Sequence, residues 1–213
     1  MTTRVSGTEG YGETAGDRVK QYESLAFADV HRPLLALFPA PPGRVIDIGA
    51  GTGRDAAAFA DLGHAVVAVE PTPELRAAAQ RLHPHPAITW VDDSLPGLDR
   101  VHARGERYDL VMLTAVWMHL DRDQRERAMG RVAPLLQPGG LMALTLRHGP
   151  VPAGRRMFEV SAAETRELAS RHGLETVLDS EGAALLGGRD VWWSRLAFRR
   201  APSAGATTCR QDG

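Results

Sequence analysis

The sequence predicts an α/β protein in which a mostly parallel sheet carries helices on both faces. Short runs rich in Val, Ile and Leu alternate with longer amphipathic stretches through most of the 213 residues. This alternation is typical of parallel strands joined by crossover helices. Hydrophobic residues make up 43% of the chain and charged residues 24%, which is the composition of an ordinary globular domain.

The central part of the chain supplies the parallel strands and their helices. Buried strands are predicted where short apolar runs occur, at 45–48, 65–69, 87–91, 108–113 and 141–146. Pro73 suits a first helical turn, and Asp121 suits an N-cap. The predicted helices lie at 54–62, 73–82 and 122–136, and the last one stops at a Pro-Gly-Gly signal.

The two ends of the chain depart from this rhythm. Residues 14–38 have a helical pattern, and a further helix is predicted at 162–172. Strands are predicted at 174–178 and 191–198. Because no crossover helix separates these two strands, they must run antiparallel to each other. The small, polar residues 201–213 are expected to be disordered.

Charge, cysteine content and hydropathy exclude several classes of protein. The formal net charge is -1, so the chain as a whole lacks the strongly basic footprint of nucleic-acid binding. The single cysteine, Cys209, can form neither an internal disulfide nor a thiolate metal site. No apolar run approaches the roughly 20 residues that span a bilayer, and the N-terminus lacks a signal-peptide core. We therefore expect a cytoplasmic protein without a membrane anchor.

The most informative segment is a glycine loop in the stretch VIDIGAGTGRD, residues 45–55. A buried strand runs into three alternating glycines and then into a helix, so bare backbone amides and a helix N-terminus can approach a ligand. Glu70 ends the next strand, nineteen residues after Gly51. An acid in this place can accept hydrogen bonds from both hydroxyls of a ribose. Both features fall at the edge where open α/β sheets bind ligands.

Two kinds of nucleotide could occupy this loop, and its spacing favours one of them. The dinucleotide fingerprint has a third glycine where this chain has Arg54. Asp47 precedes the first glycine by two residues, and its carboxylate would repel a pyrophosphate but attract an ammonium group. The residues therefore favour a nucleoside with an amino-acid tail. An NAD-dependent oxidoreductase is the alternative.

The ordered motifs of the chain resemble those of the class I S-adenosylmethionine-dependent methyltransferases. The resemblance spans roughly residues 40–200 and rests on VIDIGAGTGRD, VVAVEPTPEL, ITWVDDSLP, YDLVMLTAVWMHL and VAPLLQPGGLMALTL. It implies a Rossmann-like, seven-stranded sheet with an antiparallel last strand, in agreement with the pattern at the C-terminus. It also implies a helical lid over 1–38 and a methyltransferase domain over 39–200.

Position by position, the resemblance implies a binding site for S-adenosylmethionine. Asp47, Gly49 and Gly51 would line the methionine moiety and the sulfonium, and Glu70 would hold the ribose. The other implied residues support the loop, flank the adenine, contact the methionine end or close over the cofactor. They are Ala50, Thr52, Gly53, Asp55, Pro71, Thr72, the competing adenine-edge acids Asp92 and Asp93, Ser94, Thr114, Ala115, Tyr11, Arg18 and Tyr22.

The candidates for acceptor chemistry follow the fourth and fifth strands. Methyl transfer depends largely on positioning, and a base is needed only when the acceptor must lose a proton. His119 is the candidate base, and the alternative is that it supports the following helix. Trp117 is a candidate pocket wall. Arg147 and His148 are candidate substrate contacts, and Arg147 could clamp an anionic group.

The chain contains no asparagine, and this absence argues against a nucleic-acid base as the methyl acceptor. Enzymes that methylate base amines generally carry an Asn/Asp-Pro-Pro-aromatic stretch after the fourth strand, where this chain has residues 114–117, Thr-Ala-Val-Trp. The expected acceptor is a small molecule, with an oxyanion such as one of tellurium, or a peptide or protein, as alternatives. A non-catalytic S-adenosylmethionine-binding protein is the competing hypothesis. No metal is predicted, and both a monomer and a homodimer are compatible with the sequence.

Overall fold

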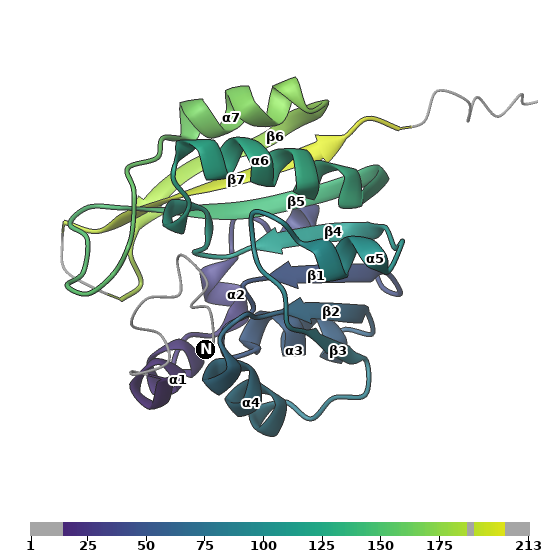
Figure 1. Cartoon of the computed structure of the whole chain (residues 1–213), viewed down its shortest axis with the longest axis vertical. Coiled ribbons are helices and arrows are strands. Elements are labelled where there is room, and N and C mark those ends of the chain that lie inside the picture. Colours follow the sequence, from purple (N-terminus) through teal and green to yellow (C-terminus); the bar gives the residue numbers. More distant parts are fainter. Residues whose placement is uncertain (1–14, 187–189, 203–213) are drawn as a thin grey trace, which may run out of the picture.

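The computed structural model describes residues 15–186 and 190–202. In this part of the chain, seven strands form one sheet, and helices cover both of its faces (Figure 1). The strands are β1 (Arg44–Ile48), β2 (Ala65–Val69), β3 (Ile88–Val91), β4 (Tyr108–Leu113), β5 (Leu136–His148), β6 (Leu174–Ala183) and β7 (Trp192–Arg200).

The helices alternate with the strands up to β6. They are α1 (Ala15–Glu23), α2 (Phe27–Val30), α3 (Arg54–Asp61), α4 (Pro73–Leu82), α5 (Asp99–Ala103), α6 (Arg122–Val132) and α7 (Ala162–Arg171), with single 3₁₀ turns η1 (Leu35–Leu37), η2 (Trp117–His119) and η3 (Ala133–Leu135). None of the helices in the described residues is long and apolar enough to cross a membrane.

The strand order is β3-β2-β1-β4-β5-β7-β6. The strands β1 to β5 pair in parallel, whereas β7 runs antiparallel to both β5 and β6. The order reverses between β1 and β4, and a reversal of this kind opens a crevice at the carboxyl ends of the strands. The predicted fold class, including its antiparallel last strand, is confirmed.

Two apolar cores hold the layers together, one on each face of the sheet. Val111 and Leu113 of β4 pack into the core on the α6 and α7 side, while Leu110 and Met112 pack into the core on the α3 side. Because strand side chains alternate between faces, a strand buried on both sides must be apolar throughout. The predicted N-cap of α6 is also observed, since the Asp121 side chain accepts a hydrogen bond from the backbone N–H of Gln124 at 2.8 Å.

Several element boundaries differ from those predicted. The helical pattern over 14–38 is broken into α1, α2 and η1. Pro33 accounts for the break between α2 and η1, because it lacks a backbone N–H and disfavours helical geometry in the residue before it. The helix α5 lies where the sequence predicts neither a helix nor a strand. The strand β5 starts at Leu136 and so includes the glycines that were predicted to end a helix. At Gly140 the backbone of β4 lies so close that a Cβ would be 3.0 Å from the carbonyl oxygen of Tyr108. Glycine therefore allows the two strands to approach each other here. Tyr11 and the tail from 203 lie outside the described residues.

Candidate active site

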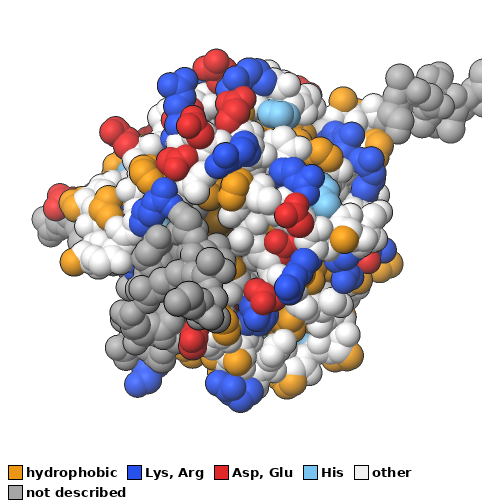
Figure 2. Space-filling model, viewed as in Figure 1, with side chains coloured by type: hydrophobic (Ala, Val, Ile, Leu, Met, Phe, Trp, Pro, Cys, Tyr) orange, Lys and Arg blue, Asp and Glu red, His pale blue; other side chains and the backbone are white. Residues whose placement is uncertain are grey.

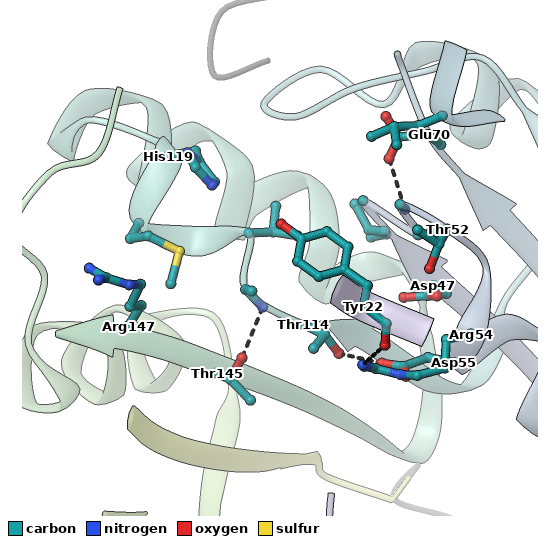
Figure 3. Close-up of a pocket in the computed structure, with 18 of the residues that line it drawn as sticks. Tyr22, Asp47, Thr52, Arg54, Asp55, Glu70, Thr114, His119, Thr145 and Arg147 are labelled. Carbon is teal, nitrogen blue, oxygen red and sulfur yellow. Dashed lines mark hydrogen bonds and ion pairs between the residues drawn. The ribbon is translucent and has the colours of Figure 1, made fainter. Parts of the chain in front are cut away.

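A cavity of about 540 Å³ lies at the carboxyl ends of β1, β2 and β4 and extends along β5 and β7. This volume lies within the range of small-molecule sites. In Figure 3, Glu70, Asp47 and Asp55 lie at one end of the site, and His119 and Arg147 lie at the other. We call the first end the glycine-loop half and the second the arginine half.

The glycine loop depends on backbone conformations that side chains disfavour. Gly49, Gly51 and Gly53 have φ angles of 76°, 57° and 85°. A Cβ on Gly49 would lie only 2.5 Å from Cγ2 of Val116. The backbone N–H of Gly49 donates to the carbonyl oxygen of Val69 at 2.8 Å. The loop is therefore fixed against the end of β2 and packed so tightly that only glycine fits at its first position.

Glu70 organises the same loop from the end of β2. Its Oε2 accepts a hydrogen bond from the backbone N–H of Gly51 at 2.9 Å, and its Oε1 accepts one from that of Thr72 at 2.8 Å. Burial raises the pKa of the Glu70 carboxyl, although these backbone donors oppose the shift. The side chain of Thr72 also hydrogen-bonds to this carboxylate, and each carboxylate oxygen can accept two hydrogen bonds.

Asp47 has a buried carboxyl group, and one of its oxygens lacks a hydrogen-bond donor within the described residues. Its side chain is 2% exposed, and within the described residues its Oδ2 has no hydrogen-bond partner. Burial raises the pKa of Asp47 well above its ordinary value, and the negative charge of Asp55 adds to the rise. A buried, unsatisfied carboxylate is costly, and a cationic group in the cavity would relieve that cost.

Asp55 ties three parts of the fold together. Its carboxylate bonds to Nε2 of His31 at 2.7 Å, to Nε of Arg54 at 2.7 Å and to the hydroxyl of Thr114 at 2.9 Å. Burial alone would raise the pKa of Asp55, but His31 and Arg54 hold it well below its ordinary value. Because His31 follows α2 and Thr114 follows β4, Asp55 anchors the N-terminal segment over the glycine loop.

The structure separates the two candidate acids at the adenine edge. Asp93 lines the cavity, and its two oxygens accept from the backbone N–H groups of Ser94 and Val101. Asp92 is not a lining residue, because its half-exposed side chain turns to Arg76 at 3.2 Å. The structure therefore places Asp93, and not Asp92, on the cavity wall, and the adenine-edge role stays a prediction.

Most other residues of the implied cofactor site lie together on the cavity wall. Gly53 is an exception, since it stands at the N-cap of α3 and packs against Trp90. The backbone of Arg18 lies in α1, and its side chain is outside the described residues. Lining residues that coincide with the implied set are Asp47, Gly49, Ala50, Gly51, Thr52, Asp55, Glu70, Pro71, Thr72, Asp93, Ser94, Thr114, Ala115 and Tyr22.

His119 lines the arginine half and has a defined tautomer. Its side chain is 7% exposed, and its Nδ1 lies 2.8 Å from the carbonyl oxygen of Arg156. A carbonyl oxygen can only accept, so in the neutral ring the proton sits on Nδ1 and the basic lone pair sits on Nε2. His119 therefore remains the candidate base that the sequence predicts.

Two of the candidate substrate contacts face elsewhere. Trp117 is fully buried in the core on the α6 side. His148 stacks on Trp192 with ring centroids 3.7 Å apart and bonds to Ser194 at 2.8 Å. Neither lines the cavity, whereas Arg147 does. Successive strand residues point to opposite faces, so Arg147 and His148 could not both enter the same pocket.

Sequence reasoning missed much of the arginine half. Arg155 and Arg195 line it together with Met118, Leu120, Met157, Leu185, Leu186, Val191 and Trp193. These residues come from η2 and the residue after it, from the β5–α7 loop, from the β6–β7 loop and from β7, and only the tertiary fold brings these segments together. The only local signal is the spacing of Trp193 and Arg195, which places both on one face of a strand.

Comparisons with known proteins agree on one family. Residues 45–140 match the family described as "Methyltransferase domain". An uncharacterized methyltransferase of Mycobacterium tuberculosis is 33% identical over 109 residues, which are 51% of this chain and 41% of that protein. A ubiquinone biosynthesis O-methyltransferase of Bradyrhizobium sp. is 34% identical over 102 residues, 48% of this chain and 39% of that protein. The matches thus span about half of this chain and less than half of these relatives.

Solved structures extend the likeness to nearly the whole fold. The 1,6-didemethyltoxoflavin-N1-methyltransferase of Burkholderia thailandensis, solved with S-adenosylhomocysteine, has a TM-score of 0.64 at 22% identity, covering 94% of this chain and 93% of that one. A TehB-like SAM-dependent methyltransferase of Corynebacterium glutamicum has a TM-score of 0.65 at 23% identity, covering 88% and 98%.

The fold and the family match together define the class of protein. Residues 45–140 match the methyltransferase domain family, and the sheet around them has the fold of the methyltransferase structures described above. The predicted resemblance to class I methyltransferases is confirmed by the family match and by the fold.

Proposed function

We propose that this chain transfers a methyl group from S-adenosylmethionine to a small-molecule acceptor by in-line displacement. The observation that carries the proposal is the buried Oδ2 of Asp47, which has no partner within the described residues. It stands on the same wall as the glycine loop and Glu70. The carboxylate of Asp47 would bind the cofactor's ammonium group, and that of Glu70 its ribose hydroxyls.

The enclosure of the cavity supports a small acceptor. Tyr22, Leu25 and Val30 line it from the N-terminal segment, and the bond between His31 and Asp55 anchors that segment. We propose that residues 1–38 act as a lid over the domain 39–200. On the face shown in Figure 2, basic and acidic side chains are interspersed, which does not favour a nucleic-acid acceptor. The proposal includes a cytoplasmic location and a monomeric or homodimeric state.

The chemistry assigns a role to each half of the pocket. When bound, S-adenosylmethionine supplies an electrophilic methyl group on a sulfonium. The residues of the glycine-loop half hold it, and the apolar wall of the arginine half excludes water from the acceptor. The acceptor's lone pair would form the new bond to the methyl carbon as the sulfur–methyl bond breaks, which leaves S-adenosylhomocysteine, and where the acceptor atom carries a proton, Nε2 of His119 would take it.

Calorimetry with S-adenosylhomocysteine tests the cofactor site. We expect Glu70→Ala to weaken binding by about 1–3 kcal/mol, because it leaves polar partners unsatisfied. Glu126→Ala is the matched control, since Glu126 is half exposed and pairs with Arg171 outside the cavity. Absence of binding by the wild-type protein at millimolar ligand would contradict the proposal.

Turnover separates the enzyme from a protein that only binds the cofactor. The measurement is transfer of label from methyl-labelled S-adenosylmethionine to a panel of phenols, amines, thiols, carboxylic acids, oxyanions and peptides. A labelled small-molecule product supports the proposal. Binding of the cofactor without any labelled product supports the non-catalytic alternative.

A further inference from the structure

Two arginines on the arginine half stand next to each other on paired strands. Thr145 of β5 pairs with Arg195 of β7, and Arg147 pairs with Trp193. Arg147 and Arg195 are therefore diagonal neighbours on one face of the sheet. Diagonal positions lie about 7–8 Å apart, within reach of long side chains. Both residues line the cavity, so two like charges share one wall.

Neither arginine has a carboxylate partner in the described part of the chain. The Nη1 of Arg147 donates to the carbonyl oxygen of Pro150 at 2.9 Å. The Nε of Arg195 lies 3.5 Å from the carbonyl oxygen of Val30, which is a long contact for a hydrogen bond. Burial lowers the pKa of both guanidinium groups, with no acid opposing the shift.

A glycine on the neighbouring strand leaves space for the side chain of Arg195. Arg195 is 9% exposed, and its guanidinium lies across β6 where the chain has Gly182. A Cβ on Gly182 would lie 2.8 Å from Nη1 of Arg195. A buried cation that lacks an anion is costly, so the site is built for a group that brings the missing negative charge.

The two halves of the cavity are sorted by charge. The acids Asp47, Glu70 and Asp93 lie on the glycine-loop half, and Arg54 is neutralised there by Asp55 at 2.7 Å. Arg147 and Arg195 lie on the opposite half. These guanidinium groups would repel a cationic acceptor and attract an anionic one.

Resting on the proposed function, we propose that Arg147 and Arg195 bind a carboxylate of the methyl acceptor, which is an apolar or aromatic acid. A carboxylate has about four acceptor sites and matches the planar guanidinium fork. The body of the acid would lie against the apolar wall formed by Met118, Met157 and Trp193.

The test uses benzoate, benzamide and phenyl phosphate as probes. Each is titrated into the protein by calorimetry, with and without saturating S-adenosylhomocysteine. We expect benzoate to bind about tenfold more tightly than benzamide, and Arg147→Gln and Arg195→Gln each to weaken benzoate binding about tenfold. Arg166→Gln is the matched control, because Arg166 lies on α7, half exposed, and pairs with Asp179. It should leave all affinities within about twofold.

The affinity for S-adenosylhomocysteine separates this proposal from the proposed function. It should stay within about twofold in both arginine variants, and it also reports whether the buried position 195 tolerates glutamine. Arg147→Gln, at a partly exposed site, tests the pair if Arg195→Gln does not fold. The proposal is overturned if benzoate fails to bind, if benzamide binds equally well, if phenyl phosphate binds more tightly than benzoate, or if Arg147→Gln leaves benzoate affinity unchanged. Failure of S-adenosylhomocysteine alone to bind overturns the proposed function.

Discussion

The two halves of the pocket differ in charge and in how the chain builds them. In the glycine-loop half, β1, its loop and α3 follow one another in sequence, and the end of β2 completes the site. Two of its acids, Glu70 and Asp93, are held by backbone N–H groups. The arginine half joins η2, β5, β7 and intervening loops, and its wall consists of side chains. Backbone geometry therefore fixes the first half, and tertiary packing determines the second.

The largest expected effect comes from adding one methyl group to the glycine-loop half. We expect Gly49→Ala to weaken S-adenosylhomocysteine binding by about 3 kcal/mol, the sum of a left-handed alanine and overpacking against Val116. Calorimetry measures the loss. Gly105→Ala is the matched control, because Gly105 also has a positive φ of 64° but no atom within 4 Å of its Cβ position. Equal affinities for the two variants would contradict the role of close packing.

A change confined to the arginine half should leave the cofactor in place. We expect His119→Gln to lower kcat about 100-fold for an acceptor that must lose a proton. The affinity for S-adenosylhomocysteine should stay within about twofold. His172→Gln is the control, since His172 is exposed at the end of α7. An unchanged kcat in the His119 variant would show that positioning alone suffices.

Asp47 should couple cofactor binding to pH in a direction that its environment sets. Its pKa is raised by burial, then by Asp55. Its protonated form therefore contributes stability that is present below the ordinary pKa, about 3.9, and is lost as the pH rises through the raised value. A cationic ligand favours the ionised form, so affinity should fall as the pH drops through that raised value.

The variant Asp47→Asn separates binding from stability. At neutral pH, we expect it to bind S-adenosylhomocysteine about tenfold more weakly. The ligand-free variant should unfold at a higher temperature than the wild-type protein, because it carries no buried charge. Calorimetry and thermal unfolding measure the two effects. A lower unfolding temperature together with unchanged affinity would assign Asp47 a purely structural role.

The same contrast explains what could be predicted from the sequence. The glycine loop and Glu70 were predictable because their neighbours in space are close in sequence or at the end of the next strand. The pairing of Arg195 with Thr145 joins segments that are distant in sequence. No local sequence pattern therefore predicts that Arg195 lies in the pocket. His148 shows the limit most directly. Its place after the predicted strand 141–146 suggested the pocket, yet His148 is the last residue of β5, and the alternation of strand side chains directs it to Trp192.

Trp117 gives the smallest expected effect and separates position in sequence from position in space. It lies two residues before His119, yet it is fully buried, and its Nε1 has no hydrogen-bond partner in the described part of the chain. We expect Trp117→Phe to change the free energy of unfolding by about 1 kcal/mol, while acceptor KM stays within about twofold. Trp193→Phe is the matched comparison, because Trp193 lines the arginine half. Trp193→Phe should change acceptor KM more than Trp117→Phe does, and it should change the free energy of unfolding less. A larger change of acceptor KM in Trp117→Phe would instead indicate that Trp117 forms part of the pocket wall.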